Sequence, residues 1–335
     1  MGTLTRPGEQ QVIGLDNSLA VLDVGHGNSA VLCDQGVVVV IDTGPGSSLL
    51  EYLSERSITH INTVLLSHAD QDHIGGLVGV LSSGTVTIDR VHVNTDSEKS
   101  SAVWEDLTML LERAGSIKFQ PALTTNDSGS FDTPRVHVKI AAPTPYLAVK
   151  GPGSVDNKGR KIGTNTISAV IRMVFNGIPI AVFPGDLDQT GLSNIIENGT
   201  PIDGRIVVFP HHGGRAGTSN MTKFAADFVN ATDPEIAVFS IGRGKHNTPR
   251  ADVISTLRKV KAKVRIACTQ LSEHCANATS TGVNRHLVAV YSEGKSKNTC
   301  CSGTVVYLLD TDQLMPDETA HTTFINLNAP TRLCK

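Results

Sequence analysis

Histidine and aspartate side chains gather in one short stretch of the chain, HADQDH at residues 68–73. Its ligand-type residues are His68, Asp70, Asp72 and His73, and they follow an apolar run at 62–67. Residues 68, 70, 72 and 73 on one tight turn can point at a common volume. Imidazole and carboxylate groups are the ligands of divalent metal sites. The stretch therefore predicts a metal site, although any one of these residues alone would be interpreted as a solvated turn residue.

Other polar groups follow apolar runs elsewhere in the chain. These groups are Asp42 after 37–41, Asp186 after 178–183, His211 and His212 after 206–209, and Lys245 with His246 after 236–240. Ligands of α/β folds collect at the carboxyl ends of strands. We therefore expect these side chains to converge with the HADQDH stretch.

The elements that must position them alternate between two periods. Short β-branched runs bounded by Gly and Asp turns predict strands, including 19–24, 30–33, 37–41, 62–67, 136–142, 167–175, 178–183 and 206–209. Apolar residues at helical spacing predict helices at 47–56, 76–81, 101–114 and 221–229. The segment at about 143–165 is rich in Gly and Lys and shows no apolar period, which predicts a long loop.

Composition narrows the protein class. The chain has 335 residues, of which 39% are hydrophobic and 18% charged, and its net charge is -3. This length suits one large α/β domain or two small ones. The charge balance excludes a disordered polyelectrolyte and a protein that grips nucleic acid by bulk positive charge. Any recognition of phosphate must therefore be local.

The six cysteines are too few and too unevenly placed for a disulfide framework. Cys268, Cys275, Cys300, Cys301 and Cys334 crowd the last quarter of the chain. A sulfur metal site with His274 would need the paired CxxC knuckles that this stretch lacks. Reduced structural thiols are the favoured interpretation.

The motifs, taken in order, resemble the metallo-β-lactamase fold superfamily, and within it the DNA-processing competence-type branch. The resemblance covers roughly residues 19–257 and rests on LDVGHGNSAVL, VVVVIDTG, HADQDH, a segment ending in PGDLD, FPHHGGRAGTS and GKHNTPRADVI. Asp70 stands where the superfamily has a second histidine, as is common in that branch. His26 and Asn28 replace the family's usual Gln and Asp. The resemblance implies a four-layer αββα sandwich with metals at one edge.

Carried over residue by residue, the resemblance implies two divalent metal ions. Asp72, His73 and one of His211 and His212 would bind one ion, His68 and Asp70 would belong to the second position, and Asp186 would bridge the two.

Asn165 stands where the superfamily's third motif supplies a histidine. The second position is thus rich in oxygen ligands, which favours Mn²⁺ or Mg²⁺ over Zn²⁺. His26 would restore a nitrogen-rich site if it reached in. Two unequal ions and a single tight one both stay open.

The remaining roles surround the metals. Asp42 would orient a metal ligand through a hydrogen bond. Asp72 and Asp186 are the expected catalytic carboxylates, and Lys245 and His246 would hold a phosphate or protonate a leaving oxygen. The residues expected to contact substrate are Arg215, Lys158, Arg160, Lys161 and Asn165.

The expected function is hydrolysis of a phosphodiester in DNA, another nucleic acid or a nucleotide, through a metal-bound hydroxide. Two alternatives remain. One is a hydrolase of small molecules such as a lactam, thioester or lactone, and the other is a metal-stabilised binding or regulatory protein without turnover. The sequence indicates no protein partner.

We expect an N-terminal arm at 1–13, one metallo-β-lactamase-like domain at 14–309, and a polar tail at 310–335 that adds little to the core. No run approaches the ~18 to 20 apolar residues of a membrane span, and the first residues lack the layout of a signal peptide. The expectation is a cytoplasmic protein.

Overall fold

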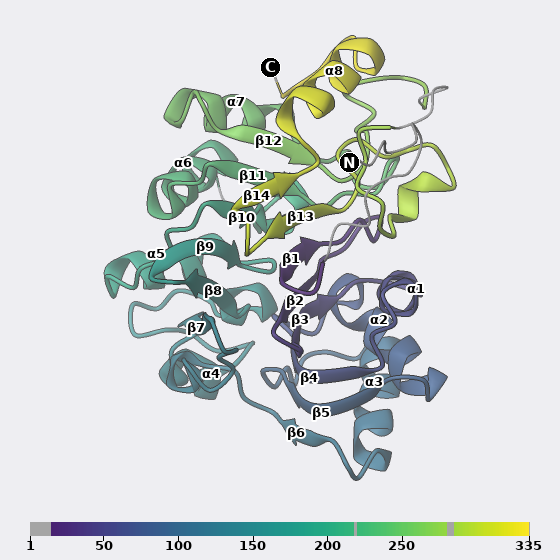
Figure 1. The fold of residues 1–335 in the computed structure, drawn as a ribbon. Coiled ribbons are helices and arrows are strands. Elements are labelled where there is room, and N and C mark those ends of the chain that lie inside the picture. Colours follow the sequence, from purple (N-terminus) through teal and green to yellow (C-terminus); the bar gives the residue numbers. More distant parts are fainter. Residues whose placement is uncertain (1–14, 218–219, 280–284, 335) are drawn as a thin grey trace.

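Two β-sheets face each other in the computed structural model, which describes residues 15–217, 220–279 and 285–334 (Figure 1). The first sheet has the order β14-β13-β1-β2-β3-β4-β5-β6, and the second has the order β12-β11-β10-β9-β8-β7. The strands of the first sheet are β1 (Ser18–Val21), β2 (Ser29–Asp34), β3 (Val37–Thr43), β4 (His60–Leu65), β5 (Thr87–His92), β6 (Lys118–Gln120), β13 (Val305–Leu308) and β14 (Gln313–Met315). Those of the second are β7 (Val136–Ala142), β8 (Val170–Phe175), β9 (Ile178–Phe183), β10 (Ile206–Val208), β11 (Ile236–Phe239) and β12 (Arg265–Cys268).

Helices cover the outer faces of both sheets (Figure 1). Those beside the first sheet are α1 (Ser48–Glu55), α2 (Gln71–Ser83) and α3 (Ala102–Arg113). Those beside the second are α4 (Pro145–Lys150), α5 (Gln189–Glu197), α6 (Met221–Thr232), α7 (Ala251–Val260) and α8 (Glu318–Asn328). Short 3-10 helices lie at Thr125–Asp127, Thr164–Ile167, Pro210–Gly213 and Glu293–Lys295.

Three apolar layers hold this arrangement together. On β3, Val39 and Ile41 face the second sheet, whereas Val38 and Val40 face the helices of the first. Such alternation follows from the period of two along a strand. A third cluster packs the second sheet against α5, α6, α7 and α8. The expected four-layer αββα sandwich is confirmed.

Both sheets change from antiparallel to parallel pairing along their length. In the first sheet β1, β2 and β3 are antiparallel, and β3, β4, β5 and β6 are parallel. In the second sheet β7, β8 and β9 are antiparallel, and β9, β10, β11 and β12 are parallel. The carboxyl ends of parallel strands share an edge, so the loops that leave them meet.

The structure differs from the sequence-based expectation in three segments. Helix α2 begins at Gln71 rather than 76, so Asp72 and His73 lie in its first turn. The expected loop at 143–165 contains α4. The segment 310–334 contributes β14 and α8, and α8 buries Phe324 and Ile325 in the core. The expected arm at 1–13 lies outside the described residues.

Within the part of the chain that the structure describes, no helix combines the length and the apolar character needed to cross a bilayer.

Candidate functional site

The close approach of helix α2 to the end of β3 builds the first half of the site. The Gly76 amide donates to the Gly44 carbonyl at 2.6 Å. A Cβ on Gly76 would lie 2.1 Å from the Thr43 carbonyl oxygen, so only glycine permits this contact. The glycine pair that follows HADQDH therefore lets the first turn of α2 pack beside Asp42.

Asp42 and Ser67 fix the orientation of two histidine rings. Asp42 Oδ2 accepts hydrogen bonds from His73 Nδ1 at 2.7 Å and from Ser67 Oγ at 2.8 Å. Because that hydroxyl donates to Asp42, it accepts from His68 Nδ1, 2.9 Å away. The Nδ1 atom of each ring thus has a protein partner, which leaves Nε2 as the ring nitrogen available to a metal. Asp42 takes the expected position, and Ser67 is a positioning residue that the sequence analysis missed.

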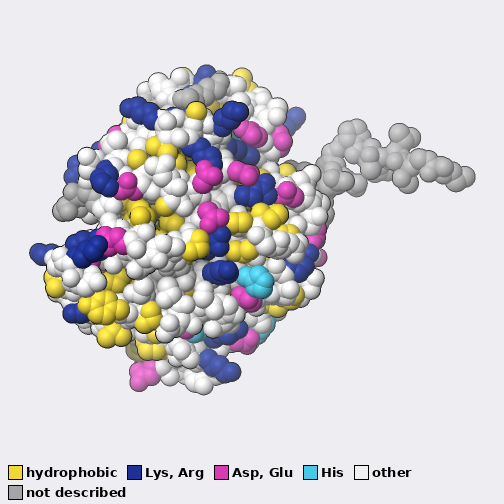
Figure 2. Space-filling view, turned by 90° about the vertical axis from the view of Figure 1, so that its left-hand side faces the viewer, with side chains coloured by type: hydrophobic (Ala, Val, Ile, Leu, Met, Phe, Trp, Pro, Cys, Tyr) yellow, Lys and Arg dark blue, Asp and Glu magenta, His cyan; other side chains and the backbone are white. Residues whose placement is uncertain are grey.

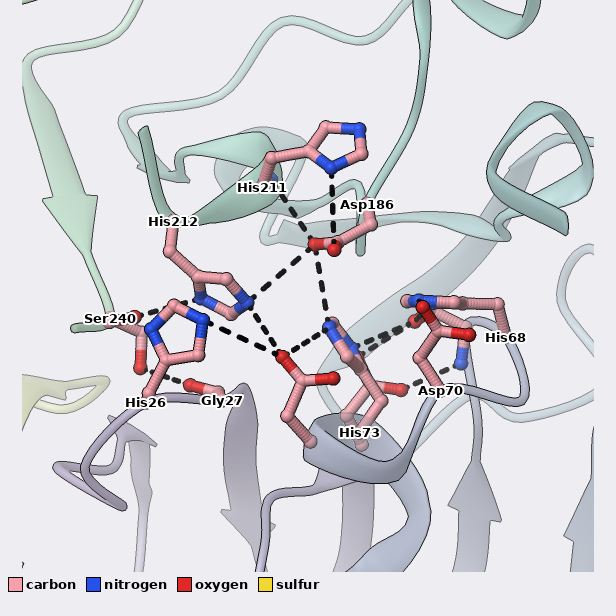
Figure 3. A network of polar contacts seen from close by, with 12 residues as sticks. His26, Gly27, His68, Asp70, His73, Asp186, His211, His212 and Ser240 are labelled. Carbon is pink, nitrogen blue, oxygen red and sulfur yellow. Dashed lines mark hydrogen bonds and ion pairs between the residues drawn. The ribbon is translucent and has the colours of Figure 1, made fainter. Parts of the chain in front are cut away.

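Four side chains converge where the two sheets meet. His212 Nε2 lies 3.1 Å from Asp72 Oδ2 and 3.8 Å from Asp186 Oδ1. His73 Nε2 lies 3.4 Å from Asp186 Oδ1 and 3.9 Å from Asp72 Oδ2. Figure 3 shows the rings of His73 and His212 directed at Asp186 from two sides. We refer to Asp72, His73, Asp186 and His212 as the central cluster.

The central cluster fits a divalent cation. Ligands about 2.1 Å from a tetrahedrally bound ion lie about 3.4 Å from one another, and the four histidine–aspartate separations of the cluster, 3.1 to 3.9 Å, are close to that value. Among the described residues, the buried Nε2 atoms of His68 and His73 have no hydrogen-bond partner. A bound cation would satisfy them.

The electrostatics of the cluster point the same way. Burial by itself raises the pKa of Asp186, but His73, His211 and His212 hold it well below the usual value. Burial likewise opposes ionisation of Asp72, and the neighbouring His212 and His73 nevertheless lower its pKa. Both carboxylates are therefore charged and available as ligands.

The two adjacent histidines after β10 play different parts. The His212 Nδ1 donates to the Ser240 carbonyl at 2.8 Å, which aims its Nε2 at Asp72. The His211 ring lies on the other side of Asp186 from His73 (Figure 3). Its backbone amide donates to Asp186 Oδ1 at 3.1 Å, and its Nδ1 lies 3.4 Å from Asp186 Oδ2. His212 thus joins the central cluster, whereas His211 contacts only its aspartate.

His68 and Asp70 lie next to the central cluster, and a lysine accompanies them. His68 Nε2 is 3.7 Å from Asp70 Oδ2. The other oxygen of Asp70 accepts a hydrogen bond from Lys99 Nζ. Burial raises the pKa of Asp70, but the bonds to His68 and Lys99 lower it to about 2. Lys99 belongs to no motif that the sequence analysis used.

His26 is brought to the site from the loop between β1 and β2. Its Nε2 lies 3.9 Å from Asp72 Oδ2, and its ring centroid is 4.3 Å from that of His212 and 4.4 Å from that of His246. Burial and the neighbouring His212 lower its pKa to about 3, so the ring is neutral at neutral pH. The replacement of the family's Gln by His26 was the only sequence signal for this contact.

An open cleft of about 1090 Å³ leads to the central cluster. Asp70, Asp72, Asp186, His211 and His212 lie on its wall. Several positively charged or imidazole side chains also line it, namely Arg215, Arg243, Lys245, His246, Arg250 and Lys297. Arg215 and Lys245 are exposed and form no ion pair with any described residue. Arg215, Lys245 and His246 thus line the cleft that leads to the central cluster.

The basic loop and Asn165 do not line this cleft, contrary to expectation. Lys158 Nζ pairs with Glu197 at 2.9 Å, and Arg160 pairs with Glu197 and Asp156. Lys161 forms an isolated bridge with Val155. Acidic side chains at the end of α5 and within the loop itself therefore neutralise Lys158 and Arg160.

Asn165 lies in the 3-10 helix Thr164–Ile167. Its buried Oδ1 has no hydrogen-bond partner among the described residues.

Charge on the face over α4, α5 and α6 is mixed. Figure 2 shows Lys and Arg side chains next to Asp and Glu across this face. This pattern agrees with the small net charge of -3.

Metal-ligating side chains come close together at two places in the described chain, and both are in this site. One group is His26, Asp72 and His212, and the other is His68, His73 and Asp186. The sulfur site considered with His274 is not formed, since His274 Nε2 contacts the Asn247 carbonyl at 3.2 Å. His92 and His137 instead contact the Ala122 carbonyl and Asp132.

Comparison with known proteins gives a family match over part of the chain. Residues 22–157 match the family model of the metallo-beta-lactamase superfamily. Competence protein ComA of Neisseria gonorrhoeae is 24% identical over 236 residues, which are 67% of this chain and 27% of that protein. The chain thus spans about a quarter of the length of the curated relative that it matches.

Several solved structures are similar to this one. Tm1679, a metal-dependent hydrolase of the beta-lactamase superfamily, is 17% identical with a TM-score of 0.45, over 75% of this chain and 95% of its own. The metallo-beta-lactamase fold protein YhfI from Bacillus subtilis is 11% identical with a TM-score of 0.45, over 76% and 96%. The short form of human tRNase Z is 13% identical with a TM-score of 0.39, over 65% and 91%.

Proposed function

We propose that this chain, whose residues 22–157 match the metallo-beta-lactamase superfamily model, is a metal-dependent hydrolase that cleaves a phosphodiester bond in a nucleic acid. The central cluster carries the proposal. Each of two charged carboxylates lies 3.1 to 3.9 Å from the Nε2 atoms of two histidines. We assign Asp72, His73, Asp186 and His212 as metal ligands, with His211 and Asp42 as residues that position them.

Hydrolysis suits this ligand set. A divalent ion bound there would lower the pKa of a water molecule and polarise a phosphoryl oxygen. Asp42 holds the proton of His73 on Nδ1, so Nε2 stays free as a ligand. Ser240 does the same for His212 through its carbonyl oxygen.

The cleft supports a phosphodiester substrate. Its basic side chains stand beside the carboxylates of the central cluster. Lys245 and Arg215 are exposed at the cleft and can bind phosphate oxygens. His246, whose ring lies next to that of His26, can give a proton to the leaving oxygen. The competence-type motifs in the sequence favour a nucleic acid over a small ester.

Hydrolysis assays of metal-stripped protein test the proposal. The protein is reloaded separately with Mn²⁺, Mg²⁺ or Zn²⁺ and incubated with single-stranded DNA, double-stranded DNA and RNA, and in parallel with a β-lactam, a thioester and a lactone. We expect metal-dependent cleavage of a nucleic acid, with higher rates in Mn²⁺ than in Zn²⁺. Asp72→Ala should reduce the rate on the order of 10³-fold, because it removes a ligand.

Asp106→Ala is the matched control, since Asp106 is an exposed aspartate on α3. Its rate should equal that of the wild type. Full activity in a folded Asp72→Ala protein would refute the assigned ligands. Turnover of the lactam, thioester or lactone alone would show that the substrate is a small molecule and not a nucleic acid. Tight metal binding with no turnover of any substrate would identify a binding protein.

A further inference from the structure

The site separates into two halves that differ in how their charge is balanced. In the central cluster, Asp72 and Asp186 are faced by the rings of His73 and His212. In the other half, Asp70 is already paired with the ammonium group of Lys99. The central cluster therefore needs a cation to balance its charge, whereas Asp70 already has the ammonium group of Lys99.

Lys99 is held in place by the loop that carries it. This loop, residues 93–101, joins β5 to α3. The Lys99 amide donates to the Asp96 carbonyl at 3.2 Å, and the buried Asp96 side chain accepts from Thr164 Oγ1 at 2.7 Å. Asn94, also buried, exchanges hydrogen bonds with the backbone of Leu123. The loop is thus fixed against the 3-10 helix that contains Asn165.

Apart from Asp70, the second position has His68 together with His73 and Asp186, and the central cluster already uses the last two. Both Asp70 oxygens already have neighbours, Lys99 Nζ on one side and His68 Nε2 at 3.7 Å on the other. The place of a third histidine is taken by Asn165. A divalent ion on Asp70 would lie close to a positive ammonium group and would be repelled by it.

We propose that Lys99 occupies the role of the second metal ion, so that the site binds a single divalent ion at the central cluster. Lys99 then supplies a second positive charge at Asp70, whose other oxygen neighbours His68. This inference rests on the ligands assigned in the proposed function. It predicts how many ions bind, independently of what the protein hydrolyses.

Metal stoichiometry tests this inference without an activity assay. Metal-stripped wild-type protein is equilibrated with excess Mn²⁺, freed of unbound ion, and analysed by elemental analysis and electron paramagnetic resonance. We expect about one ion per chain, with the spectrum of an isolated Mn²⁺. Lys99→Met should bind about two ions per chain, with a spin-coupled spectrum, because Asp70 loses its ammonium partner and becomes available as a ligand.

Two controls separate charge from position. Lys99→Arg keeps the positive charge and should stay at about one ion. Lys118→Met removes an exposed lysine on β6 and should also leave the wild-type value unchanged. Thermal unfolding confirms that each variant is folded.

Each outcome decides the matter. Two ions in the wild type overturn the role of Lys99 while leaving the hydrolase proposal intact, and this measurement needs no variant to fold. One ion in a folded Lys99→Met protein also overturns it, because the lysine is then not what excludes the second ion. No bound ion in the wild type overturns both this inference and the proposed metal centre.

Discussion

In the described part of the chain, two regions bring sulfur or nitrogen ligands together. The residues of only one of them fit a metal ion. The central cluster sets histidines against buried aspartates. The other region is a small apolar pocket lined by Cys268, Cys275, Cys301 and Cys334, which we call the cysteine pocket. Cys301 Sγ lies 3.4 Å from His321 Nε2, so residue types alone would suggest a site in both.

The surroundings of the two regions differ in charge. No carboxylate lines the cysteine pocket, whose other walls include Ile254, Leu271 and Ile325. Burial raises the pKa of Cys268 and Cys301 well above the usual value, so both stay as thiols. Because its walls are apolar, we interpret the pocket as a packing element. Charge available at neutral pH, more than residue type, distinguishes the site.

The largest effect is expected from Asp186→Ala. Asp186 contacts His73, His211 and His212, so its loss removes the charge around which the central cluster is built. We expect bound metal and activity to fall on the order of 10³-fold. The metal-free variant should unfold at the same temperature as the wild type or higher, since one of two adjacent carboxylates is gone. Elemental analysis, the hydrolysis assay and calorimetry check this. Metal retained by Asp186→Ala would show that the central cluster does not depend on the charge of Asp186.

Asp42→Asn should have the next largest effect. The substitution removes the charged acceptor of His73 Nδ1 and Ser67 Oγ. Loss of such a partner lowers metal affinity or activity by about 10 to 100-fold. Metal titration followed by competition with a chelator measures the change.

Asp34→Asn is the matched control for Asp42→Asn. Asp34 is also buried at an end of the first sheet, but it accepts from Thr133 at 2.6 Å and from Arg135 at 2.7 Å. It should reduce the free energy of unfolding and leave metal affinity unchanged. Equal effects of the two variants on metal affinity would mean that Asp42 acts through stability alone.

The sequence predicted the convergence of the site because the rule behind it is local. Asp42 lies at the end of β3, and Asp186 and His212 follow β9 and β10, whose parallel pairing places their ends at one edge. The four-layer sandwich was implied by the resemblance to the metallo-β-lactamase fold superfamily, and the order of the strands within each sheet was not predicted.

Contacts made by loop residues could not be predicted from the sequence. Lys99 reaches Asp70 because Asp96 binds Thr164, a residue 68 positions away along the chain. Arg160 was expected to contact substrate. In the structure it pairs with Glu197 of α5, which lies 37 residues further along the chain. Such pairings depend on how the folded chain packs, and the hydrophobic periodicity of the sequence does not predict them.

The C-terminal segment shows the same limit in the core. Phe324 and Ile325 are isolated apolar residues in a polar stretch, and their burial depends on the second sheet lying beneath α8. The polar composition of this segment therefore led to an underestimate of its contribution to the hydrophobic core.

The cysteine-pocket region should show its own pH dependence through His321. Burial lowers the pKa of His321 to about 3, with the charge of Arg265 adding to the effect. In the unfolded chain the pKa is about 6.5. Below pH 6.5 the unfolded state therefore takes up a proton that the folded state refuses, and the free energy of unfolding falls as the pH falls toward 3.

At pH 5 this loss amounts to about 2 kcal/mol. Urea unfolding between pH 4.5 and 7.5 measures it. His321→Leu should show a shallower slope over the same range, by up to one proton. Identical slopes in the two proteins would show that His321 keeps a normal pKa and that its surroundings are not apolar.

The smallest effect is expected from Cys268→Ala. If the cysteine pocket is a packing element, the loss of one buried sulfur leaves a methyl-sized gap and costs about 1 kcal/mol. Cys33→Ala, in the isolated buried cysteine of β2, should cost a similar amount. Urea unfolding compares the two, and elemental analysis for zinc should find the same metal content in both variants as in the wild type. Loss of zinc from Cys268→Ala alone, with a stability loss well above that of Cys33→Ala, would show that the thiols ionise to bind a metal and that an apolar lining does not prevent it.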